Sequence, residues 1–123
     1  WSLPPVATPD EIETPGALID SYHRTALRSA MSKYVGVLRT PEGLDSASRI
    51  LNTLSSNMSA TVVPTRKAFE ATNMLTIAMA VVEAAKTRTE SRGCHRRIDF
   101  DAPSDSWNHH LSCRVVDGQI EVK

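Results

Sequence analysis

Residues 83–100, EAAKTRTESRGCHRRIDF, decide how this chain is organised. A long apolar run leads into them, and Gly93 is expected to end the helix that this run forms. The residues around the expected helix end are densely charged: Lys86, Arg88, Glu90, Arg92, His95, Arg96, Arg97 and Asp99. We expect the segments before this stretch to be helices that pack against the apolar run, and the segments after it to form a short tail.

The longest predicted helix covers residues 66–89. Between Met74 and Ala85 only Thr76 and Glu83 interrupt its apolar residues, so that apolar side chains fall on nearly every side. Such a helix is buried most of the way round. Because a domain of three helices can cover only part of that surface, we expect either the tail or another protein surface to cover the rest.

Two further helices are predicted before it. Residues 17–38 place apolar side chains at spacings of three and four, which forms one helix face. Thr40-Pro41-Glu42 provides the hydroxyl, proline and carboxylate that favour a helix start. A seam of heptad type follows it: Leu44, Ala47, Leu51, Leu54 and Met58. The predicted fold class is therefore all-α, an up-down-up three-helix bundle like a spectrin repeat, over residues 17–111.

Both ends of the chain are predicted to lie outside the bundle. Residues 1–16 contain four of the seven prolines and are predicted to be a linker, so we expect the chain to be part of a longer polypeptide. Residues 112–123 are predicted to form a C-terminal extended tail, in which a β-hairpin can turn at Asp117-Gly118, a pair typical of a type I′ turn.

Composition excludes several classes of function. The chain of 123 residues is expected to be one domain, and its 14 basic residues balance 14 acidic ones. A protein that binds nucleic acid or an anionic membrane needs an excess of basic charge, so neither partner is expected. No window approaches 18 apolar residues without charge, so we expect no membrane-spanning helix. Cys94 and Cys113 are too few for a disulfide scaffold, which favours reduced thiols in the cytoplasm.

A zinc site can be drawn from five residues: Cys94, His95, His109, His110 and Cys113. Their types suit zinc, but their spacing matches no common zinc pattern, so ordinary thiols and surface histidines are the preferred interpretation. Cys94 could also be a reactive thiol, because its basic neighbours favour the thiolate, yet no base or pocket accompanies it. Since a glycine-rich phosphate loop is also missing, we expect no catalytic, cofactor-binding or metal-binding residue in this chain.

The charged residues at the expected helix end have two interpretations. Lys86, Arg88 and Arg92 can complement the negative end of the helix dipole, with Gly93 in the left-handed conformation. Alternatively, the charged groups form ion pairs with another domain. Glu90 and Arg92 are too close in sequence to face each other on a helix, so they would meet different partners. Both interpretations stay open at this point, and the candidate docking residues are Arg88, Glu90, Arg92, His95, Arg97 and Asp99.

The segment from Asn73 to Leu111 resembles the C-terminal helical domain of the succinate dehydrogenase, fumarate reductase and L-aspartate oxidase flavoproteins. In that superfamily a helix ends in R-x-ESRG-x-H-x-R-x-D, and an acidic stretch and a tryptophan follow. The matching residues here are Asn73, Leu75, Arg88, Glu90, Ser91, Arg92, Gly93, His95, Arg97, Asp99 and Trp107. Upstream, LRSAMSKYVGVLRTPEGLDSA resembles the first helix and turn of the same family, and its VGVLR part looks most like the L-aspartate oxidase branch.

The resemblance implies a longer parent enzyme in which this chain is a non-catalytic domain, inactive by itself. The parent would bind FAD and oxidise L-aspartate to iminoaspartate, a step in quinolinate and NAD biosynthesis. Its flavin-binding and capping domains would be the partners of this chain, and quinolinate synthase is a further candidate partner. The alternatives are a succinate dehydrogenase or fumarate reductase flavoprotein subunit, and a free-standing helical interaction module.

Overall fold

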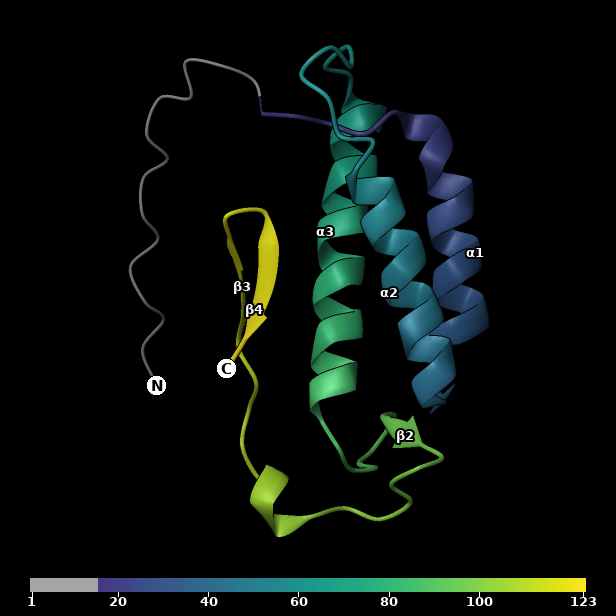
Figure 1. Cartoon of the computed structure of the whole chain (residues 1–123), viewed down its shortest axis with the longest axis vertical. Coiled ribbons are helices and arrows are strands. Elements are labelled where there is room, and N and C mark those ends of the chain that lie inside the picture. The colour runs from purple at the N-terminus through teal and green to yellow at the C-terminus, as the bar shows by residue number, and fades with distance from the viewer. Residues whose placement is uncertain (1–15) are drawn as a thin grey trace.

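The computed structural model describes residues 16–123, so the predicted linker, residues 1–16, falls almost wholly outside the described part. Three α-helices make up most of the structure: α1 (Arg24–Tyr34), α2 (Pro41–Ser55) and α3 (Arg66–Thr87). They lie side by side and alternate in direction along the chain (Figure 1). A 3₁₀ turn, η1 (Ser21–His23), precedes α1, and a second one, η2 (Asp105–Trp107), follows α3.

Side-chain caps set the starts of α2 and α3. Thr40 Oγ1 accepts a hydrogen bond from the Gly43 N–H at 2.9 Å, and Pro41 takes the first position of α2. The predicted helix start at this point is confirmed. Thr65 caps α3 in the same way, with a bond of 3.2 Å from the Ala68 N–H to Oγ1.

α1 is shorter than the helix predicted over residues 17–38. The Asp20 side chain accepts a hydrogen bond from the Tyr22 N–H at 3.1 Å, which fixes the η1 turn ahead of the α-helix. The helix then ends at Tyr34, two residues before Gly36, a residue type that is unfavourable in a helix.

The core lies between the three helices and includes Ile19 ahead of α1 and Leu27 of α1. Its largest wholly buried apolar side chains are Ile19, Leu44, Leu51, Leu75 and Val82. α3 contributes a seam of buried residues at alternating spacings of four and three: Ala71, Leu75, Ala78, Val82 and Ala85. Within the described part of the chain, α3 therefore buries one seam and not its whole circumference.

The all-α class predicted from the sequence is incomplete, because the chain also forms two small sheets. β1 (Leu38–Arg39) pairs in parallel with β2 (Arg96–Arg97), with Leu38 opposite Arg96. β3 (Cys113–Val116) and β4 (Gln119–Val122) form an antiparallel hairpin. The predicted turn is confirmed, since Asp117 (φ 50) and Gly118 (φ 75) both have the positive φ that a type I′ turn requires.

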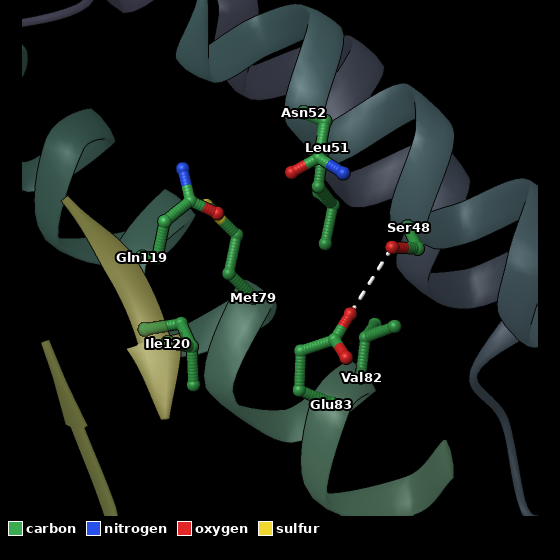
Figure 2. A pocket seen from close by; sticks show the side chains of 8 residues that line it. All are labelled: Ser48, Leu51, Asn52, Met79, Val82, Glu83, Gln119 and Ile120. Carbon is green, nitrogen blue, oxygen red and sulfur yellow. Dashed lines mark hydrogen bonds between the residues drawn. The ribbon is translucent and has the colours of Figure 1, made fainter. Parts of the chain in front are cut away.

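The hairpin lies along α3 (Figure 1). A cavity of about 190 Å³ lies where α2, α3 and β4 meet, and its lining includes Leu51, Met79 and Ile120 (Figure 2). Another pair of lining residues is hydrogen-bonded, with Ser48 Oγ donating to Glu83 Oε1 at 3.1 Å. The tail thus covers one side of α3, which is one of the two ways of covering the helix that the sequence predicts.

By length and composition alone, α3 is capable of crossing a membrane, contrary to the sequence-based expectation. The central helix of a globular core passes the same test, and α1, α2 and the hairpin all contact α3 in this structure. The contacts of α3 with α1, α2 and the hairpin, and not its composition, therefore indicate that it is a core helix.

Candidate functional site

Gly93 does not end the third helix, so the prediction of the helix stop is wrong. α3 ends at Thr87, and the carbonyl groups of its last turn are capped by a residue further along the chain. Arg97 Nη1 donates to the carbonyl oxygens of Ala85 at 3.1 Å and Lys86 at 2.9 Å. These are groups that a helix end otherwise leaves without partners, so Arg97 performs the capping that the sequence assigns to Gly93.

Gly93 does adopt the left-handed conformation (φ 56), but in a tight turn beyond the helix. Arg92 and His95 flank this turn and exchange both backbone hydrogen bonds, at 2.8 and 3.0 Å. Glycine takes up a positive φ without steric cost. The turn places the side chains of Arg92 and His95 close to the end of α3.

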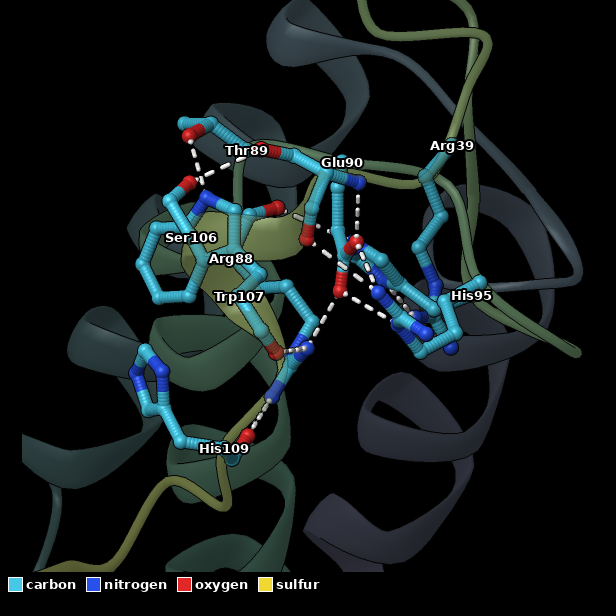
Figure 3. A network of polar contacts seen from close by, with 10 residues as sticks. Arg39, Arg88, Thr89, Glu90, His95, Ser106, Trp107 and His109 are labelled. Atoms are coloured by element: carbon cyan, nitrogen blue, oxygen red, sulfur yellow. Dashed lines mark hydrogen bonds and ion pairs between the residues drawn. The ribbon is translucent and has the colours of Figure 1, made fainter.

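Glu90 is the centre of a polar network at that end (Figure 3). Its side chain is completely buried. Arg92 binds it in a bidentate manner, with Nε 3.0 Å from Oε1 and Nη2 3.1 Å from Oε2. The Ser104 N–H donates to Oε2 at 2.8 Å, and Arg88 Nη1 donates to Oε1. We call these four residues the Glu90 network, in which both carboxylate oxygens have charge-assisted partners.

The donors around Glu90 keep its carboxylate ionised. The hydrogen bonds from Arg92 lower the pKa of Glu90 to about 2, with smaller contributions from the Ser104 N–H and Arg88, although burial acts in the opposite direction. The same bonds raise the pKa of Arg92. A carboxylate with so low a pKa is poorly suited to take up a proton near neutral pH, as a general base must. Glu90 is therefore a structural anion.

Arg88 connects the end of α3 to the segment around η2 (Figure 3). Its Nη1 donates to the Trp107 carbonyl oxygen at 2.9 Å and its Nη2 to the His109 carbonyl oxygen at 2.6 Å. The guanidinium group also lies over the Trp107 ring, 5.5 Å from its centroid. Trp107 Nε1 donates in turn to Thr89 Oγ1 at 3.0 Å. These contacts hold residues 104–109 against the helix end.

A second ion pair lies beside the Glu90 network. Arg97, whose side chain is only 7% exposed, binds Asp99 with Nε 2.9 Å from Oδ1 and Nη2 2.6 Å from Oδ2. These bonds lower the pKa of Asp99. The buried Ser91 Oγ accepts from the Arg97 N–H at 2.8 Å and donates to the Phe100 carbonyl oxygen at 2.5 Å. The pair therefore fixes residues 91–100 on the end of α3.

His95 links this loop to β1 (Figure 3). Its Nδ1 lies 2.6 Å from Arg39 Nη1, and its Nε2 lies 3.0 Å from the Arg88 carbonyl oxygen. Because arginine can only donate, Nδ1 accepts and Nε2 carries the proton, so the imidazole is neutral. Burial lowers the pKa of His95, and the positive charges of Arg39, Arg97 and Arg88 act in the same direction.

We expect the chain to lose stability as the pH falls from neutral through the titration of His95. The pKa of this residue in the folded chain lies below its unfolded value of about 6.5. In that window the unfolded chain binds more protons, so the free energy of unfolding decreases as the pH falls and is fully restored above the window. Melting temperatures followed by circular dichroism between about pH 8 and about pH 5 should show the decrease.

His95→Gln should flatten this pH profile, because the amide that replaces the imidazole does not titrate in this range. A decrease of the same size in the His95→Gln variant would contradict the assignment to His95.

A cleft of about 660 Å³ adjoins the Glu90 network. Its basic lining residues are Arg39, Arg88, Arg92, His95, His109 and His110. Val81 and Ala84 of α3, together with Leu111, supply an apolar part of the lining. No acidic side chain among the described residues lines the cleft. Glu90 is fully buried and does not belong to the lining. We call this the basic cleft.

All six predicted docking residues lie at the end of α3, where the structure gives most of their charged groups a partner within the chain. The expectation that Glu90 and Arg92 meet different partners is wrong, because the backbone between them is not helical. Sequence reasoning misses Arg39 and Ser104 in this site. Their contacts depend on the pairing of β1 with β2 and on the return of the chain after Asp99, and neither has a local sequence signal.

The residues of the alternative zinc site do not come together. Cys94 lies in the turn after Arg92 and Cys113 on β3, and both thiols are exposed. Cys113 Sγ lies 3.9 Å from the Ala80 carbonyl oxygen. Across residues 16–123, no three His, Cys, Asp or Glu side chains are grouped so that they could hold a metal ion.

The model of the fumarate reductase flavoprotein C-terminal family matches residues 24–123. Because the match covers most of the chain, the chain belongs to this family of flavoprotein C-terminal domains. The superfamily resemblance inferred from the sequence is thereby confirmed.

Individual relatives carry the names of oxidoreductases. An L-aspartate oxidase of Rhodospirillum rubrum is 36% identical over 109 residues, which make up 89% of this chain and 36% of that protein. An L-aspartate oxidase of Streptomyces coelicolor is 32% identical over 120 residues, or 90% of this chain and 21% of that protein. A succinate dehydrogenase flavoprotein subunit of Coxiella burnetii is 30% identical over 125 residues, or 94% of this chain and 20% of that protein. The chain spans between 20% and 36% of the length of these relatives.

Proposed function

We propose that this chain is the non-catalytic C-terminal domain of a cytoplasmic, FAD-dependent L-aspartate oxidase. The observation that carries the structural role is the state of the charged residues after α3. Glu90 and Arg97 are buried and bonded within the chain, and the pKa of Glu90 is too low for proton transfer near neutral pH. The parent enzyme would oxidise L-aspartate to iminoaspartate for quinolinate and NAD biosynthesis, and the FAD would be held by the preceding domains.

The surface that would meet those domains is the uncovered face of α3. Ile77 is 65% exposed, and Phe69 and Val81 lie on the same face at spacings of eight and four residues. A groove of about 600 Å³ runs beside them between α1 and α3, with Leu27 and Met31 in its lining. This chain spans only 36% and 21% of the two L-aspartate oxidase relatives, so we infer that the additional length of such proteins, the flavin-binding and capping domains, covers the groove.

The three helices would serve this role as a rigid up-down-up bundle, with the candidate docking residues at one end. The ion-paired docking residues would then stabilise the conformation of the loops at the end of α3. They are Arg88, Glu90, Arg92, Arg97 and Asp99. His95 would hold Arg39 in position at the same end, through the contact between Nδ1 and Nη1.

The second candidate is a succinate dehydrogenase or fumarate reductase flavoprotein subunit. It is favoured by the Coxiella burnetii relative, which matches 94% of this chain. The two candidates are separated by the substrate. We would express the polypeptide extended at its N-terminus, supply FAD, and measure peroxide release with L-aspartate and with succinate. Aspartate-dependent peroxide supports the oxidase. Turnover of succinate alone with an artificial acceptor supports the second candidate, and a folded polypeptide without flavin or turnover would leave an interaction module as the better account.

Ile77→Asp is expected to weaken the parent protein without unfolding this domain. The side chain is exposed in the chain by itself, so the melting temperature of the 123-residue chain should stay within about 2 °C of the original. In the extended polypeptide the carboxylate would be buried without a partner, and its melting temperature should fall by about 5 °C or more. Thermal unfolding of both proteins measures the difference.

Val63→Asp is the matched control for this experiment, since Val63 is 71% exposed and lies in the loop before α3, away from the groove. Equal losses for Ile77→Asp in the chain and in the extended polypeptide would overturn the groove as the contact surface.

A further inference from the structure

The basic cleft carries more positive charge than the chain neutralises. Three guanidinium groups line it, from Arg39, Arg88 and Arg92. Glu90 is the carboxylate that pairs with Arg88 and Arg92, and Arg39 has no acidic partner among residues 16–123. His95 is neutral, and the Asp105 carboxylate also acts electrostatically on Arg92, so the residues at the cleft carry a net excess of roughly one positive charge, that of Arg39. Desolvation of such an excess is costly unless an anion accompanies it.

Donor groups in the cleft are also left over. Arg39 Nε donates to the Gly36 carbonyl oxygen at 3.0 Å and Nη1 to His95 Nδ1, whereas Nη2 has no partner in the described part of the chain. Arg92 uses Nε and Nη2 for Glu90 and Ser104, and its Nη1 likewise has no partner there. A carboxylate can accept from two guanidinium groups at once, so its chemistry matches what these residues offer.

The position of the cleft indicates where that carboxylate comes from. Val81 lines both the basic cleft and the apolar groove between α1 and α3. The two depressions are therefore neighbours on one surface, and a protein segment that covers the exposed face around Ile77 reaches the cleft directly. A diffusible anion would not need this apolar continuation, whereas an interface combines an apolar centre with charged contacts beside it.

We propose that the basic cleft is the docking site for an acidic side chain of the flavin-binding part of the same polypeptide, with Arg39 as its main contact. The inference rests on the proposed function. His95 is a positioning residue in this site, because it holds Arg39 by Nη1 and leaves Nη2 free. The contact is polar and lies beside the apolar groove, so it contributes orientation and salt dependence to an association that the groove dominates.

The test supplies this 123-residue chain in trans to the separately produced N-terminal part of the longer polypeptide. Isothermal titration calorimetry gives the dissociation constant at about 50 mM and about 300 mM NaCl, a range over which charge contacts are screened. Arg39→Gln should weaken binding about 10-fold at low salt and reduce the salt dependence. Arg39→Lys should restore part of the affinity, because the charge is kept while the second donor edge is lost. Circular dichroism melts of each variant verify folding.

Arg114→Gln is the control, since Arg114 is an exposed arginine of the hairpin that pairs with Glu121. Wild-type affinity of Arg39→Gln at both salt concentrations, with binding still lost in Ile77→Asp, would overturn the acidic contact and leave the proposed function intact. No binding of the unmodified chain to an N-terminal part that is folded by circular dichroism and holds FAD would overturn both. A site for a small diffusible carboxylate is the remaining outcome, and it also contradicts the proposal. In that case sodium acetate would shift the NMR resonances of His95 and Trp107 in the chain alone, and Arg39→Gln would abolish these shifts. The Arg39→Gln variant would still bind the N-terminal part with normal affinity.

Discussion

Glu90→Gln is expected to lower the melting temperature of the chain by on the order of 10 °C. The amide has one oxygen where the carboxylate has two, and its NH₂ group would face donors of Arg92 or Ser104. Two guanidinium groups would then lose their common anion, which is wholly buried although the Arg92 side chain is 43% exposed. Removing one partner of such an ion pair leaves the other charges uncompensated. Thermal unfolding at neutral pH measures the effect.

The same residue should determine how the chain responds to acid. In the folded chain the pKa of Glu90 is about 2, whereas a carboxyl group in an unfolded chain has a pKa of about 4.3. Its contribution is therefore fully present above pH 4.3 or so and is lost as the pH falls towards about 2. Glu90→Gln should lack this part of the acid profile.

Glu70→Gln is the control, because it removes a half-exposed partner of Arg24 and Arg66. It should change the free energy of unfolding by less than about 1 kcal/mol. Equal losses for the two variants would contradict the role given to Glu90.

Arg97→Ala is the second change with a large expected effect, a loss of about 3 kcal/mol in the free energy of unfolding. It removes the partner of Asp99 and the donor to the carbonyl oxygens of Ala85 and Lys86 in one step. The last turn of α3 should fray, and the Arg88 amide, which donates to the Ala84 carbonyl oxygen at 3.0 Å, should lose protection from hydrogen exchange.

The chain provides a close control in Arg96→Ala, because Arg96 is adjacent, equally charged and exposed. Arg97→Lys should recover only part of the stability, since an ammonium group cannot reproduce the planar donor arrangement that reaches Asp99 and both carbonyl oxygens. If Arg96→Ala and Arg97→Ala cost the same, the charge of this loop and not the capping geometry would be responsible.

Local signals were sufficient for much of the fold. The start of α2 follows from Thr40 and Pro41, whose hydroxyl and ring act within one turn. The hairpin follows from Asp117-Gly118, which meets the positive φ requirement of its turn. Periodicity locates the buried seam of α2, because its inward-facing side chains recur at helical spacing. It does not locate the seam of α3, for which the sequence predicts burial on nearly every side, whereas the helix buries one seam.

The candidate site could be only partly predicted, because its contacts are not local. A glycine after a charged run is a good helix stop, yet the cap of α3 comes from Arg97, ten residues or more beyond the carbonyl groups it binds. Glu90 and Arg92 cannot face each other on a helix, and they do so here only because α3 ends earlier. Composition alone would leave a small helical domain, and the family was predicted from the ESRG segment.

The parallel pair of β1 and β2 has a consequence for the order of folding. Its two residue pairs are Leu38 with Arg96 and Arg39 with Arg97. Their pairing closes a loop of roughly 60 residues, at an entropic cost of about 4 kcal/mol. Hydrogen bonds that each contribute about 1 kcal/mol do not offset that cost in so short a ladder. The strands can therefore pair only after α2 and α3 have packed and brought the chain back on itself. The amide of Ile98, which donates to the Arg39 carbonyl oxygen at 3.0 Å, thus reports a step that follows the packing of α2 and α3.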